Sequence, residues 1–147
     1  MTELTSSSLI KLTSAPDATT NQRETRCLPS YIAVQSPTLA LILEAGFLEA
    51  QTNSITLDSI TPDALRQCVT FLRDSNSTPE LESVIETLYA AKYLELDRLV
   101  ESCCKLIAKH YNDLPKHTLQ YFSNEFVLRI CRRRRLHLFV ICLICFL

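Results

Sequence analysis

A short alternating segment followed by three amphipathic runs, between residues 53 and 111, limits most strongly what this chain can fold into. Residues 54–58 alternate so that Ile55 and Leu57 fall on one face, which predicts a strand. Each run then begins with its own start signal: Thr61-Pro62-Asp63, Thr78-Pro79-Glu80 and Glu95-Leu96-Asp97. The order predicts a strand and three helices joined by short loops, with no catalytic motif between them.

The three predicted helices span residues 62–73, 79–92 and 97–110. Each carries apolar residues three and four positions apart, the spacing of one buried helix face. These residues are Leu65, Cys68, Val69 and Leu72; Leu81, Val84, Ile85, Leu88 and Ala91; and Leu99, Val100, Cys103, Leu106 and Ile107. We interpret all three stripes as core. Because the loops are short, consecutive helices should pack antiparallel or at a sharp angle.

The amino-terminal third predicts a hairpin and one more helix. Residues 7–12 are expected to form a first strand, residues 13–21 a loop rich in turn-forming residues, and residues 23–28 the returning strand. Ser36-Pro37 is a further helix start signal, followed by an apolar stripe of Leu39, Ile42 and Leu43. Gly46 falls where that helix should end, as a glycine just past a helix end does.

Composition excludes several functions. Gly46 is the only glycine, so no glycine-rich phosphate-binding loop is present. All sixteen acidic residues precede Arg132, and residues 1–131 contain eleven basic residues, which gives them a net charge of −5. A mildly acidic body is a poor match for nucleic acid. We therefore expect protein partners and no nucleic acid.

The cysteines and histidines show no catalytic or metal-binding arrangement. The seven cysteines lie mostly on apolar helix faces, and no signal peptide precedes them, which favours reduced thiols in the cytoplasm or nucleus. Cys142 and Cys145 have CxxC spacing but lack a second pair, so we expect no metal and no cofactor. None of the three histidines has a nucleophile or carboxylate at a recognisable motif spacing. The sequence predicts a protein that is not an enzyme.

The carboxyl-terminal part divides in two. Residues 112–131 are expected to form a helical extension with Leu119, Phe122 and Phe126 on its apolar face. Residues 132–147 form a basic-apolar tail of four arginines followed by an apolar run. As a helix, that run is about 18 Å long against roughly 30 Å of bilayer hydrocarbon, so we do not expect it to span a membrane. Contact with a membrane surface is the weaker alternative.

Several of these residues resemble a known family. The matching pieces are Ser36-Pro37, Gly46-Phe47-Leu48-Glu49, the strand with Ile55 and Leu57, and the run Tyr89-Ala90-Ala91-Lys92-Tyr93-Leu94-Glu95-Leu96. Together they resemble the BTB/POZ superfamily, which includes elongin C and the Skp-type adaptors. The resemblance covers about residues 8–111, preceded by a disordered segment at 1–7. The tail replaces the acidic, tryptophan-bearing end of Skp-type chains.

The resemblance implies an α+β fold, a three-stranded sheet covered by about five to six helices. It also implies a non-catalytic adaptor that bridges a cullin to a substrate receptor in a cullin-RING ubiquitin ligase. Phe47, Leu48 and Glu49 would contact the cullin, with Tyr89 and Tyr93 on the same face, and the extension carrying Leu119, Phe122 and Phe126 would bind the receptor. A self-associating module that serves as an assembly hub is the alternative. The elongin-like, Skp-like and homodimeric subtypes all stay open.

Overall fold

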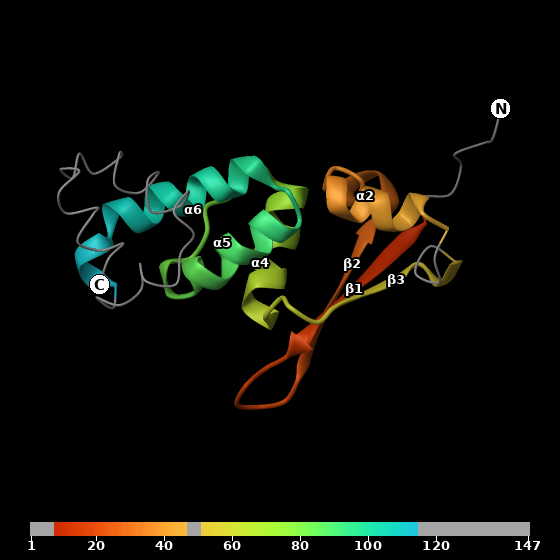
Figure 1. Cartoon of the computed structure of the whole chain (residues 1–147), viewed down its shortest axis with the longest axis horizontal. Coiled ribbons are helices and arrows are strands. Elements are labelled where there is room, and N and C mark those ends of the chain that lie inside the picture. The colour runs from red at the N-terminus through yellow and green to blue at the C-terminus, as the bar shows by residue number, and fades with distance from the viewer. Residues whose placement is uncertain (1–7, 47–50, 115–147) are drawn as a thin grey trace, which may run out of the picture.

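A mixed three-stranded sheet and a group of helices make up the described part of the chain. The structure, a computed structural model, describes residues 8–46 and 51–114 (Figure 1). Its elements are β1 (Leu9–Pro16), β2 (Arg23–Pro29), α1 (Ser30–Ala33), α2 (Pro37–Glu44), β3 (Ser54–Leu57), α4 (Pro62–Arg73), the 3₁₀ turn η1 (Leu81–Ser83), α5 (Val84–Tyr93), α6 (Asp97–Lys109) and the 3₁₀ turn η2 (Tyr111–Asp113). The predicted α+β class is confirmed.

The sheet has the order β2-β1-β3, with β1 in the centre. Strand β1 pairs antiparallel with β2, where Leu12 faces Arg26, and parallel with β3, where Leu12 faces Ile55. Ile55 and Leu57 are buried, as their alternation predicts, and Ile10 and Leu12 of β1 are buried as well. Helix α4 packs against β1 and β2, and α5 packs against both α4 and α6. In Figure 1, α4, α5 and α6 lie together at one end of the molecule and α2 lies beside the sheet at the other.

The first strand is longer than its composition predicts. Residues 13–16 were expected in a loop, but β1 continues to Pro16, with a register shift between Thr13 and Pro16. Ser14 is fully buried. Its hydroxyl accepts the N–H of Glu24 at 2.9 Å and donates to the carbonyl of Ala15 at 2.7 Å. Pairing on both edges therefore overrides the local turn preference of serine and threonine.

The turn itself forms around Asp17. Its Oδ1 accepts the backbone N–H groups of Thr19 at 2.8 Å and Thr20 at 3.0 Å, and the Thr19 hydroxyl at 2.6 Å. These hydrogen bonds favour the ionised form and lower the pKa of the Asp17 carboxyl to about 2. Residues 17–22 thus form a side-chain-stabilised turn that overlaps the predicted loop at 13–21.

Two of the three proline start signals work as predicted. Helix α2 begins at Pro37, where the Ser36 hydroxyl accepts the N–H of Leu39 at 3.3 Å. Helix α4 spans the predicted residues, and the Thr61 hydroxyl accepts the N–H of Ala64 at 3.4 Å. Gly46 follows α2 with φ +70°, the left-handed conformation expected just past a helix end.

The third signal, Thr78-Pro79, does not start a helix, and this prediction was wrong. The chain stays extended to Glu80, turns through η1 and enters α5 at Val84. The Glu80 N–H, which Thr78 would have accepted as an N-cap, donates instead to the Gln67 Oε1 of α4 at 2.8 Å. The Arg66 guanidinium also binds both Glu80 carboxylate oxygens, at 3.1 and 3.2 Å. Contacts with α4 therefore hold this segment away from helical geometry.

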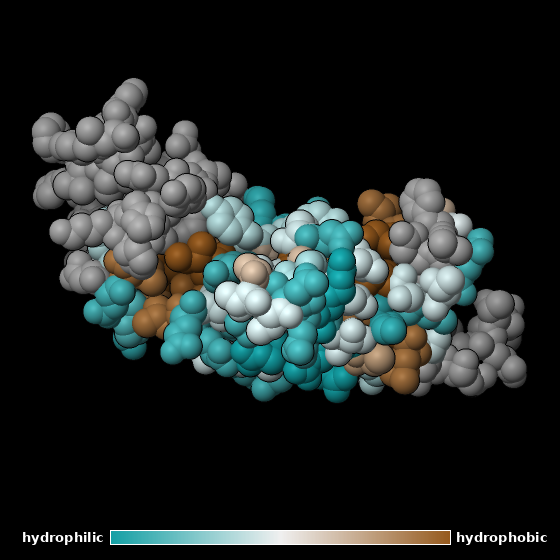
Figure 2. Space-filling model, turned by 90° about the horizontal axis from the view of Figure 1, so that it is seen from below, coloured by the Kyte–Doolittle hydropathy of each residue, from teal (hydrophilic) through white to brown (hydrophobic). Residues whose placement is uncertain are grey.

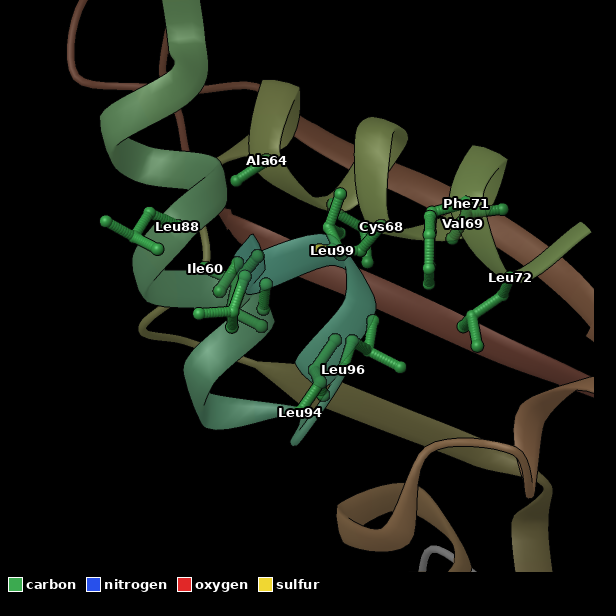
Figure 3. Packing of buried hydrophobic residues seen from close by; sticks show 14 of the residues in the cluster. Ile60, Ala64, Cys68, Val69, Phe71, Leu72, Leu88, Leu94, Leu96 and Leu99 are labelled. Atoms are coloured by element: carbon green, nitrogen blue, oxygen red, sulfur yellow. The ribbon is translucent and has the colours of Figure 1, made fainter. Parts of the chain in front are cut away.

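The core lies between the sheet and the three long helices. All of the predicted stripe residues of α4 are buried, as are most of those on α5 and α6, while Leu81, Ile85 and Leu106 are partly buried. Figure 3 shows Cys68 of α4 and Leu99 of α6 pointing into the same space. Burial raises the pKa of the Cys68 thiol to about 12 and also raises that of Cys103, so both thiols stay protonated and behave as small apolar groups.

The turn between α5 and α6 contains a non-glycine residue in the left-handed conformation. Glu95 has φ +56°, while its N–H donates to Lys92 and the Leu96 N–H donates to Ala91, the two hydrogen bonds of a Schellman motif. We expect Glu95→Gly to raise the free energy of unfolding by about 0.5 to 1 kcal/mol, because glycine adopts this conformation without a Cβ clash. Urea unfolding checks this; a lower midpoint for Glu95→Gly would contradict it, and Glu86→Gly inside α5 should destabilise.

Candidate protein-interaction surface

The residues predicted to contact partners are only partly within the described ranges. Phe47, Leu48 and Glu49 lie outside the described residues, directly after Gly46 at the end of α2. Leu119, Phe122 and Phe126 of the predicted extension also lie outside them. Only Tyr89 and Tyr93 can therefore be placed in the structure.

Tyr89 and Tyr93 lie one turn apart on α5, so they share a face of that helix. Their exposed fractions are 41% and 50%. Partial burial raises the pKa of the Tyr89 phenol above its ordinary value, which keeps the hydroxyl neutral. Large half-exposed aromatic side chains supply apolar area together with a hydrogen-bonding group, as contact residues at interfaces do. At the turn after α5 the buried residue is Leu94, while Tyr93 is half-exposed.

Two hydroxyl groups join the start of α2 to the end of α5. The fully buried Ser36 hydroxyl donates to the Leu94 carbonyl at 2.7 Å, and the Thr38 hydroxyl donates to the Tyr93 carbonyl at 2.8 Å. The last carbonyls of a helix lack partners within it, so these two hydrogen bonds satisfy the carboxyl-terminal end of α5. They place Tyr93 directly beside the first turn of α2.

A set of exposed apolar side chains lies at the start of β1, on α1 and the residue after it, and on α2. We call it the α1–α2 surface, and its members are Leu9, Tyr31, Val34 and Leu41. Leu41 is the most exposed, at 68%. It follows Thr38 by one helical turn, so it continues the surface from Tyr93 along α2. Figure 2 shows hydrophobic residues exposed at this end of the molecule. Clustered exposed apolar residues of this kind mark interaction sites.

Sequence reasoning missed the α1–α2 surface, although one signal was available. The stripe of Leu39, Ile42 and Leu43 points into the protein, and Leu39 is fully buried while the other two are partly buried. Leu41 is the large apolar residue of that helix outside the stripe, so its position alone indicated an outward side chain. The roles of the Ser36 and Thr38 hydroxyls depend on α5, which is more than fifty residues away, and had no local signal.

The described residues contain neither a metal-binding cluster nor a membrane-spanning helix. Among residues 8–46 and 51–114, no group of three or more histidine, cysteine, aspartate or glutamate side chains is placed to hold a metal ion. Within the same ranges, no helix combines the length and apolar character needed to cross a membrane.

Comparison with known families identifies the domain. The sequence matches the family model of the BTB/POZ domain over residues 18–111, more than half of the chain. The chain belongs to the BTB/POZ family. No curated protein and no solved structure matches it. BTB domains are typically non-catalytic modules for protein–protein interaction and often dimerise, so protein partners are expected of this domain. The mixed sheet and its helices agree with this family.

Proposed function

We propose that this chain is a non-catalytic adaptor that bridges a cullin to a substrate receptor in a cullin-RING ubiquitin ligase. The observation that carries the proposal is the α1–α2 surface of this BTB domain, because its exposed Leu41 lies on the helix that precedes the residues resembling a cullin-contact motif. An adaptor of this kind needs no catalytic group, because it acts by raising the effective concentration of the substrate near the ligase. We place its action in the cytoplasm or nucleus.

We assign the cullin contact to the α1–α2 surface together with Phe47, Leu48 and Glu49. These three residues follow α2, whose exposed Leu41 and neighbouring Tyr93 would continue the same contact. Phe47 would fill an apolar pocket on the partner and Glu49 would orient the partner by charge, since a few anchor residues carry most of the energy of an interface. Leu119, Phe122 and Phe126 are proposed to bind the substrate receptor, and Tyr89 lies at the margin of the cullin contact.

The proposal predicts that Phe47→Ala combined with Glu49→Ala removes cullin binding without unfolding the protein. We expect a loss of at least a hundredfold in affinity, because both a buried anchor and a charge contact disappear. The measurement is a pull-down of purified cullin amino-terminal regions, with circular dichroism to compare the folding of the variants. Asp63→Ala, which removes an exposed carboxylate at the start of α4, is the matched control and should bind normally.

Cullin capture by the double variant at the level of the unsubstituted chain would refute the assigned contact. Loss of helical circular dichroism in the double variant would refute the claim that these residues act only in binding.

Self-association is the second candidate function. The α1–α2 surface favours it as well, because exposed apolar residues of similar chemistry on two copies can cover one another. In that case the domain would serve as a structural or transcriptional assembly hub rather than as a cullin adaptor. The two functions differ in the mass of the particle that the chain forms, alone and with a cullin.

A further inference from the structure

A separate hollow lies between α6 and the extended segment before η1. Its volume is about 320 Å³, and its lining residues are Thr78, Pro79, Ser102, Lys105, Leu106 and Lys109. Leu106 is partly buried against the core, and the carbon stems of the two lysines add apolar surface while their amines reach solvent. This volume is at the lower end of the range for ligand sites. The hollow therefore has the size for one or two apolar side chains.

The wall formed by Thr78 and Pro79 is held in place from behind. Glu80, the next residue, receives two hydrogen bonds from Arg66 and donates its N–H to Gln67. The proline ring also limits the backbone conformations of the segment. Because the wall is already ordered, a ligand need not supply the free energy to order it, which favours binding.

Two lysine side chains at this hollow favour a ligand that carries negative charge. Lys105 and Lys109 lie one turn apart on α6, and both are exposed. Neither side-chain amine forms an ion pair or hydrogen bond with another described residue. They form a local positive site on a body whose net charge is −5 over residues 1–131. An apolar hollow flanked by two free amines is complementary to an apolar side chain flanked by carboxylates.

The carboxyl-terminal part of this chain does not have that chemistry. Residues 115–147 contain six basic residues and a single acidic one, Glu125. Like charges would oppose the approach of this segment to Lys105 and Lys109. The charge pattern therefore favours a segment of another protein.

We propose that this hollow is a docking site for an acidic peptide segment of a partner protein, which inserts an apolar side chain between carboxylates. The α1–α2 surface lies at the other end of the molecule, beside α2 in Figure 1. One partner can therefore occupy the hollow while another covers the α1–α2 surface. The inference goes beyond the adaptor function and does not depend on cullin binding.

Fluorescence anisotropy with the full chain tests this site. The probe is a fluorescein-labelled Glu-Glu-Leu-Leu-Glu-Glu peptide, compared with peptides in which serine replaces leucine or lysine replaces glutamate. We expect only the first peptide to bind, and we expect Lys105→Glu with Lys109→Glu to weaken it at least tenfold. Ser102→Phe, which fills the hollow and keeps both lysines, should weaken it similarly. The matched control is Lys11→Glu with Lys92→Glu, the same change of charge outside the lining of the hollow.

Backbone amide shifts in NMR spectra identify where the peptide binds. Shifts at Thr78 and along residues 102–109 support the proposal. No binding at millimolar peptide, equal affinity for the Lys105→Glu, Lys109→Glu variant, shifts confined to residues 132–135, or preference for the basic peptide would each overturn it. Shifts of residues 102–109 that grow with protein concentration alone would overturn it too, because a second copy would then be the occupant.

Discussion

Leu88→Ala is expected to lower the free energy of unfolding by about 2 to 5 kcal/mol. Leu88 lies on α5, between α4 and α6, and its side chain is fully buried. Truncation removes buried apolar surface and leaves a cavity that close-packed neighbours fill only partly. A domain of this size has a total stability of roughly 5 to 15 kcal/mol, so this one change removes a large share of it. Urea unfolding followed by circular dichroism measures the difference.

Leu41→Ala is the matched control for this prediction. The chemical change is identical, but Leu41 is 68% exposed on α2, so we expect its effect on stability to stay within about 0.5 kcal/mol. Equal destabilisation by the two substitutions would contradict the described packing of α5 and the outward position of Leu41.

Ser36→Ala is expected to cost about 2 to 3 kcal/mol, although serine and alanine differ by one oxygen atom. The hydroxyl caps α2 by accepting the Leu39 N–H, and a lost cap costs about 1 kcal/mol. It also donates to the buried Leu94 carbonyl at 2.7 Å, which would lose its partner at a further cost of about 1 to 3 kcal/mol. The two terms overlap, so their full sum is an upper bound.

Thr38→Val provides the comparison for Ser36→Ala. It removes a hydroxyl that donates to the neighbouring Tyr93 carbonyl, but at a more exposed place where water can replace it. Thermal unfolding should show a smaller decrease in Tm for Thr38→Val than for Ser36→Ala. The reverse order would mean that the buried Ser36–Leu94 hydrogen bond does not hold α2 to α5 as described.

The elements that could be predicted from the sequence are those whose signals are local. Ser36-Pro37 and Thr61-Pro62 start helices because the capping hydroxyl and the N–H that it accepts lie three residues apart. The same dipeptide signal at Thr78-Pro79 does not start a helix. Arg66 and Gln67, more than ten residues earlier, bind Glu80 and hold the segment in an extended conformation. Similarly, β1 extends through Ser14 because its partners lie on two other strands.

The candidate surface was less predictable than the fold. The shared face of Tyr89 and Tyr93 follows from their spacing of one helical turn. Their position beside α2 does not, because it depends on hydrogen bonds from Ser36 and Thr38 to the end of α5. The hollow beside α6 could not be predicted from the sequence either. Thr78 and Pro79 line it as part of an extended segment, where the sequence predicts the first turn of a helix.

The most direct test of the adaptor function is light scattering after size-exclusion chromatography, on the chain alone and mixed with cullin amino-terminal regions. The account predicts that one cullin shifts the chain into a particle whose mass includes both proteins, and that Phe47→Ala with Glu49→Ala prevents the shift. A dimer mass for the chain alone that no cullin changes would contradict the adaptor function and favour the self-associating hub. A monomer that binds no cullin would contradict both functions.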